Sequence, residues 1–212
     1  MEMEAIVRRL GRLSGKQPIG LDEFGGISMS KLLPDFARLN AAGKLFAFDT
    51  HAGTAKAPVV AAPTTSPEWG LYNDSENETL VLIQVGCTLK SGTAGLGLAL
   101  MGTSAKGKQT AVAADYTGAI KGCLDGTKKD ASFYITNNPT LVGGTPPWVV
   151  LETTKVNTVA TDSVGDGLVA QPNGLFIAPP GGMVAFEVVG ETGTSALFSV
   201  SGIVAMLELD RY

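Results

Sequence analysis

The residues whose side chains could carry out chemistry are few and widely spaced in this chain. It has one histidine, His51, and two cysteines, Cys87 and Cys123. Imidazole is the usual protein ligand of catalytic zinc, iron or copper, and one histidine cannot supply a facial triad. A Ser-His-Asp triad would also have to use His51, and no G-x-S-x-G elbow occurs. We therefore expect no catalytic residue, no cofactor and no catalytic metal, and we predict that the protein is not an enzyme.

Two polar segments come closer to ligand-binding motifs. Residues 102–109, GTSAKGKQ, match G-x-x-x-x-G-K, but Gln109 stands where a phosphate loop needs Ser or Thr for Mg²⁺. The strand-like TAVAAD follows instead of a helix, so we expect a polar hairpin loop. Residues 73–78, NDSENE, gather oxygen ligands suited to Ca²⁺ without EF-hand spacing, as Asp162 and Asp166 do more weakly. A solvated loop tip is the expected state of both acidic segments.

Strand-like segments dominate the chain from residue 44 onward. Short apolar runs alternate with turn clusters such as SVGDG, PPGG and GETGT, about 8–12 residues apart, and no βαβ alternation is present. This pattern predicts a mainly β domain over residues 44–212, an antiparallel jelly-roll or β-sandwich. The expected strands are KLFAFDT, ETLVLIQVGCTLK, LGLALMG, QTAVAAD, ASFYITN, WVVLETTKVNTVAT, GLVAQ, GLFIA, MVAFEVVG and ALFSVSGIVAMLEL. Cys87 lies within one of these runs and is expected to be buried.

The stretch LFIAPPGGMVAFEVVGE, residues 175–191, contains a sharply defined turn. Its two prolines have no backbone N–H, so strand pairing must stop there, and one of its two glycines should take a positive φ. After the turn, alternate residues should face opposite sides of the sheet. We expect Glu187 to point outward or to an edge, and its replacement by Gln to change stability little. The side chains expected to enter the core are Val184, Phe186 and Val188.

Residues 1–43 differ from the rest and predict an N-terminal, partly helical arm. Apolar residues recur at helical spacing over residues 6–13 and again over residues 28–42, where Gly43 marks the stop. An isolated short helix is marginal in water, so its apolar side should face a partner or the β domain. The predicted interface residues are Leu10, Leu13, Leu32, Leu33 and Phe36.

The composition of the chain indicates which kinds of partner it can bind. Charged residues make up 17% of the chain and hydrophobic residues 44%. Apolar surface should therefore remain outside the monomer core and mark an interface, which predicts a homo-oligomer, with a trimer as the expected form. A net charge of −4 argues against a nucleic-acid partner, because phosphate binding depends on clustered Lys and Arg. The longest nearly apolar run is too short to span a bilayer, so no membrane partner is expected.

The arm and the C-terminal series GLFIAPPGGMVAFEVVGETGTSALFSVSGIVAMLEL resemble tailed-phage virion proteins, in particular jelly-roll decoration or cement proteins. The shared features are Gly-, Ala-, Thr- and Val-rich strands with low charge. The resemblance implies a protein made in the host cytoplasm that stabilises the virion by clamping between major capsid protein subunits. Two alternatives stay open. A carbohydrate-binding β-sandwich, for example on a viral fibre, would use exposed aromatic residues such as Trp69 or Trp148. A degenerate cupin-like enzyme is the third.

Overall fold

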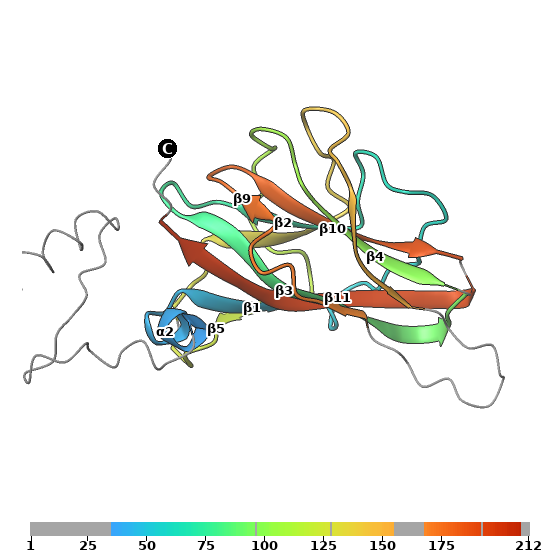
Figure 1. The fold of residues 1–212 in the computed structure, drawn as a ribbon, viewed down its shortest axis with the longest axis horizontal. Helices are drawn as coiled ribbons and strands as arrows, with labels where there is room; N and C mark the ends of the chain where they lie inside the picture. Colours follow the sequence, from blue (N-terminus) through green and yellow to red (C-terminus); the bar gives the residue numbers. More distant parts are fainter. Residues whose placement is uncertain (1–34, 96, 128, 155–167, 192, 209–212) are drawn as a thin grey trace, which may run out of the picture. The chain divides into compact units, whose positions relative to one another are not determined.

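The computed structural model describes residues 35–208, apart from residues 96, 128, 155–167 and 192. The chain divides after Arg38, and the unit over residues 39–212 holds the β domain. Its described strands form two antiparallel sheets that pack face to face, with the long β3 and β11 running along one layer (Figure 1). The predicted antiparallel β-sandwich is confirmed.

One sheet has the strand order β5-β1-β11-β3-β8, with β9 also beside β3, and the other has the order β6-β2-β10-β4-β7. We call them the β1 sheet and the β2 sheet. The strands are β1 (Leu45–Asp49), β2 (Trp69–Asn73), β3 (Thr79–Thr93), β4 (Leu98–Ser104), β5 (Ile120–Cys123), β6 (Phe133–Asn137), β7 (Val149–Thr154), β8 (Leu168–Ala170), β9 (Ile177–Ala178), β10 (Met183–Gly190) and β11 (Thr194–Leu207).

The pairing of the strands reveals how the chain is rolled. β1, β2, β3 and β4 pair with β11, β10, β8 and β7 respectively. The chain is thus one long antiparallel ribbon, wrapped so that successive pairs fall in alternate sheets, which is a jelly-roll arrangement. β5 and β6 lie within the connection from β4 to β7 and extend the sheets, β5 beside β1 and β6 beside β2.

Large side chains from the two sheets fill the space between them, because alternate residues of each strand point inward. Phe48 of β1 stacks on Phe186 of β10 with ring centroids 6.1 Å apart. Phe46 meets Phe133 edge to face at 6.2 Å. Cys87 is buried in the same core, as predicted, and desolvation raises the pKa of its thiol to about 11.

Helix α2 (Asp35–Ala41) ends where the sequence predicts. Gly43 has a φ of 63° and donates its N–H to the Asn40 carbonyl at 2.8 Å, while Lys44 donates to the Leu39 carbonyl at 2.9 Å. These two bonds form a Schellman cap, which satisfies carbonyls that the helix end leaves free. Leu39 packs on the outer face of the β1 sheet. Residues 28–34 of the predicted helix lie outside the described residues.

The strands around the connection from β4 to β7 differ from the prediction. Residues 109–115, QTAVAAD, form no strand, and the chain after β4 does not return as a hairpin. Instead, residues 105–119 run as a loop, and Val112 packs on the outer face of the β2 sheet. The segment is therefore apolar because it packs on the face of a sheet, and it is not itself a strand of that sheet. β2 and β5 were not among the expected strands, because both are short and are interrupted by a glycine, Gly70 in β2 and Gly122 in β5.

Candidate functional site

The Pro-Pro-Gly-Gly turn is a structural crossing between the two sheets. β9 ends at Ala178 and β10 begins at Met183, so pairing stops at the prolines, and Gly181 takes a φ of 72°. Both predictions for this turn are confirmed. Asn73 at the end of β2 anchors the turn, because its backbone N–H donates to Gly182 at 3.0 Å and its carbonyl accepts from Gly181 at 2.9 Å. Its side-chain amide also donates to the Ala178 carbonyl at 2.8 Å.

The two polar segments considered as ligand sites use their polar groups to hold local structure. The Asn73 side-chain oxygen accepts from the Ser75 N–H at 3.0 Å, and Ser75 Oγ accepts from the Glu78 N–H at 2.9 Å. In the phosphate-like loop, Gln109 donates to the carbonyl of Val142 at 3.1 Å and accepts from its N–H at 2.8 Å. Within the described residues, no group of three or more His, Cys, Asp and Glu is placed to hold a metal ion. Asp162 and Asp166 lie outside those residues.

Trp69 lies in the core and is 2% exposed, so it cannot serve as the exposed platform that the carbohydrate-binding alternative would need. Its strand, β2, is buried between β6 and β10. Trp148 is partly buried; its indole N–H donates to the Thr64 carbonyl at 3.1 Å, and its ring packs against the cluster that contains Tyr72 and Leu141.

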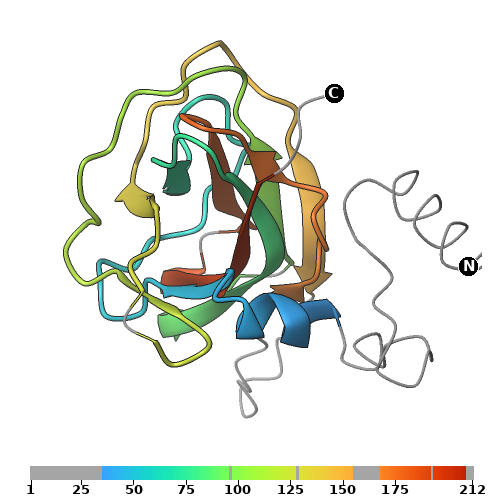
Figure 2. The same cartoon turned by 90° about the vertical axis from the view of Figure 1, so that its left-hand side faces the viewer.

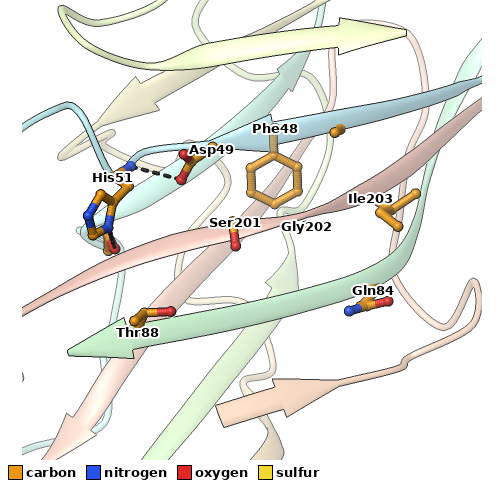
Figure 3. A pocket seen from close by; sticks show the side chains of 10 residues that line it. Phe48, Asp49, His51, Gln84, Thr88, Ser201, Gly202 and Ile203 are labelled. Atoms are coloured by element: carbon orange, nitrogen blue, oxygen red, sulfur yellow. Dashed lines mark hydrogen bonds between the residues drawn. The ribbon is translucent and has the colours of Figure 1, made fainter. Parts of the chain in front are cut away.

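An open depression of about 490 Å³ lies on the outer face of the β1 sheet (Figure 3). Side chains from β1, β3 and β11 line it, because these strands are neighbours in that sheet. Its size falls in the range of small-ligand sites. Its polar lining residues are Asp49, His51, Gln84, Thr88, Ser199 and Ser201.

His51 and Ser199 meet in this depression. His51 Nδ1 lies 3.1 Å from Ser199 Oγ, a pairing that no local sequence pattern signals. Asp49 Oδ1 accepts from the backbone N–H of His51 at 2.9 Å and does not bond its ring (Figure 3). In a Ser-His-Asp triad the carboxylate must bond the ring nitrogen that the serine does not use. These three residues therefore lack the orientation of a triad, and they offer a surface of hydrogen-bonding groups.

Exposed aliphatic side chains lie along the strands at the sheet ends. β7 ends the β2 sheet and β8 ends the β1 sheet, and the two strands are in contact. Figure 2 shows β7 beside the segment that carries β8 and β9. Val150 on β7 is 51% exposed and Val169 on β8 is 52% exposed. At the other end of the β1 sheet, Ile120 on β5 is 58% exposed. We call the following side chains the edge residues: Ile120, Val149, Val150, Val169 and Ile177.

Phe36 is the predicted interface residue that falls in the described part of the chain. It lies on α2 and is 46% exposed. The other four predicted interface residues lie outside the described part, so their role stays a prediction. They are Leu10, Leu13, Leu32 and Leu33.

Glu187 is buried, with 0% of its surface exposed, so the prediction that it points to solvent is wrong. It does lie on the face of β10 opposite Phe186, as alternation requires. That face is covered where the connection from β1 enters β2, and the Glu68 N–H there donates to Glu187 Oε2 at 2.9 Å. Desolvation raises the pKa of Glu187 to about 8; the Glu68 carboxylate adds to the rise, while two backbone hydrogen bonds and Lys56 oppose it.

The chain matches no family model, no curated protein and no solved structure. Among the described residues, no helix has the length and hydropathy needed to cross a bilayer. Jelly rolls serve viral capsids, lectins and cupins, and the fold alone does not select among these uses. The surfaces of the β domain are therefore the features that can favour one of them.

Proposed function

We propose that this protein is a non-enzymatic structural component of a virion, a capsid decoration protein that acts as a homo-oligomer. The observation that carries the proposal is the exposure of the edge residues on strands that end both sheets. Unpaired N–H and C=O groups at a sheet edge recruit other strands, so soluble proteins usually protect an edge with charges, prolines or bulges. β7 carries a bulge beside Val150, but Val150 and Val169 both stay exposed on their edges. Exposed aliphatic side chains on such edges fit surfaces that another subunit covers.

The fold and the composition support the same proposal. The jelly roll is an architecture common in viral capsid proteins. A charged fraction of 17% leaves apolar surface for subunit contacts. The resemblance to tailed-phage decoration proteins adds the major capsid protein as partner and the virion as location.

Binding to virions tests this function. Virions of the virus that encodes this protein should contain the protein at a fixed number of copies per capsid subunit, as measured by quantitative mass spectrometry. Purified full-length protein should rebind, to saturation, to particles stripped of it. Its absence from particles, or binding that does not saturate, would contradict the virion role.

Oligomerisation is a separate prediction. At tens of micromolar, light scattering of the full chain should give the mass of an oligomer, with a trimer expected. Val150→Glu should lower that mass at equal concentration, because the variant places a charge in an apolar contact without a partner. Thr153→Glu, on an exposed position of the same strand, adds the same charge and should keep the wild-type mass. A monomeric wild-type protein, or a Val150→Glu variant of unchanged mass, would argue against edge-mediated assembly.

A carbohydrate-binding role is the second candidate, and the open depression is the observation that favours it. The carboxylate of Asp49, the imidazole of His51 and the hydroxyl of Ser201 are groups that can bond sugar hydroxyls. Screening the full chain on a glycan array tests this role, and Asp49→Ala should abolish any specific signal. Binding that survives this substitution would place a sugar site elsewhere. The degenerate cupin-like enzyme stays a hypothesis.

A further inference from the structure

The connection from β1 to β2, residues 50–68, leads from one sheet to the other, and we call it the strap. Lys56 exchanges backbone hydrogen bonds with Phe198 of β11 at 2.9 and 2.7 Å, which holds the first part of the strap on the β1 sheet. The carbonyl of Glu68, the last strap residue, accepts from the N–H of Asn138 at 3.0 Å, just after β6 of the β2 sheet. The backbones of Lys56 and Asn138 are therefore held by different sheets.

The side chains of these two residues are in direct contact. Lys56 Nζ donates to Asn138 Oδ1 at 2.7 Å and lies 3.1 Å from Glu68 Oε2. Because Oδ1 is bonded to the amide carbon Cγ, the amine nitrogen stands beside an electrophilic carbon. Glu68 Oε2 is shielded from solvent and accepts no hydrogen bond from the part of the chain that the structure describes. An amine, an amide and a carboxylate oxygen thus meet at one point.

Lys56 differs from the other ion-paired lysines of the described residues. Its side chain is 12% exposed, compared with 29% for Lys44 and 16% for Lys121. Lys44 pairs with Glu78 and Lys121 with Asp115, whereas Lys56 adds a side-chain amide to its carboxylate partner. A lysine becomes a nucleophile when an adjacent base takes its proton in a site that is poor in water.

The amide of Asn138 is held for attack by this amine. Asn138 has a φ of 49°, a left-handed conformation that asparagine tolerates, and its N–H bond to the strap fixes that backbone. The backbone nitrogen that follows an asparagine is the common internal nucleophile for its side chain. Here that nitrogen belongs to Pro139, which carries no N–H and cannot react in this way. Lys56 Nζ therefore has no competitor in the adjacent backbone.

We propose that Lys56 and Asn138 join through an isopeptide bond, with Glu68 accepting the proton whose removal activates the amine. Glu68 Oε2 takes one proton from Lys56 Nζ, and the lone pair of Nζ then adds to Asn138 Cγ. The Nζ–Cγ bond forms and the Cγ–Nδ2 bond breaks, while a second proton moves from Nζ to Nδ2. Nδ2 leaves as ammonia, which takes the proton from Glu68 and departs as ammonium. One amide replaces another, so no oxidant, reductant or cofactor is needed.

The bond links the two sheets covalently, between residues 82 positions apart in the chain. Cys87 and Cys123 are both free, so these two cysteines do not supply such a link. A covalent bond that closes a long loop restricts the unfolded chain, and it therefore favours the folded state. The reaction occurs once within each chain, and it does not depend on the proposed virion role.

Mass spectrometry of the full-length protein tests the proposal. The intact mass should fall below the mass of the sequence by one ammonia, about 17 Da. Trypsin should not cut after Lys56, because its amine is acylated, and should release residues 45–90 joined to residues 130–155. This branched peptide distinguishes the cross-link from a loss of ammonia within a single asparagine. An intact mass equal to that of the sequence, or separate peptides cut after Lys56, overturns the proposal.

Three variants identify the reacting groups. Lys56→Arg keeps the positive charge without the amine, and Asn138→Gly keeps the positive φ without the amide, so both should keep the full mass of their sequences. Glu68→Gln should leave most chains without the cross-link. Asn173→Gly is the matched control, since Asn173 is also exposed with a φ of 50°, and it should lose ammonia as the wild type does.

A loss of ammonia that persists in Lys56→Arg contradicts the cross-link, and complete cross-linking in Glu68→Gln contradicts the role of Glu68. If a variant does not fold, the branched peptide of the wild type still decides whether the bond exists.

Discussion

Replacing Phe186 with alanine should lower the free energy of unfolding by about 3–5 kcal/mol, as measured by urea denaturation. Phe186 is 0% exposed and stacks on Phe48 of the facing sheet, with the two rings inclined by 9°. The substitution removes buried apolar area and leaves a cavity between the sheets. Because the surrounding strands are hydrogen-bonded on both sides of β10, they cannot collapse freely into that space.

Val60→Ala provides the control for Phe186→Ala. Val60 is 72% exposed, so its truncation should change stability by no more than about 0.5 kcal/mol. A loss below about 1 kcal/mol in Phe186→Ala would mean that the two sheets do not pack as described.

The strand β10 illustrates what a sequence pattern can and cannot predict. Its period of two correctly places Phe186 inside and Glu187 on the other face. Whether that other face meets water depends on segments distant in the chain. Glu68 lies 119 positions from Glu187, and no local pattern predicts that contact. The same holds for the roll of the sandwich, because turn spacing predicts strands and says nothing of which distant strands pair.

The depression and the core differ in how far a sequence pattern could predict them. His51 and Ser199 lie 148 positions apart and meet because β1 and β11 are neighbours, so a sequence pattern could not pair them. The burial of Trp69, by contrast, is indicated by the residues around it. The run WGLYN is apolar and follows Pro67, which is typical of a short buried strand. The presence of a glycine at position 70 weakened that pattern, although the close approach of Met183 explains it.

The contribution of Glu187 to the free energy of unfolding should decrease as the pH rises from about 4.5 to about 8. The ordinary pKa of a glutamate side chain, 4.5, applies to the unfolded chain, and burial raises the pKa of Glu187 in the folded protein to about 8. Between these values the folded state keeps a proton that the unfolded state releases, so raising the pH favours unfolding. The contribution is fully present below about 4.5 and is lost as pH passes about 8. Each pKa unit corresponds to at most about 1.4 kcal/mol, so the total reaches several kcal/mol.

Urea unfolding of the wild type and of Glu187→Gln at pH 5, 7 and 9 measures this contribution. Contributions from the rest of the chain are common to both proteins and cancel in the difference between the two profiles. That difference should favour the variant increasingly from pH 5 to pH 9, because its amide stays neutral in the buried site. Glu152→Gln should keep the wild-type slope. Parallel profiles for the wild type and Glu187→Gln would mean that Glu187 keeps its ordinary acidity in the folded state, and that its carboxyl group is open to water.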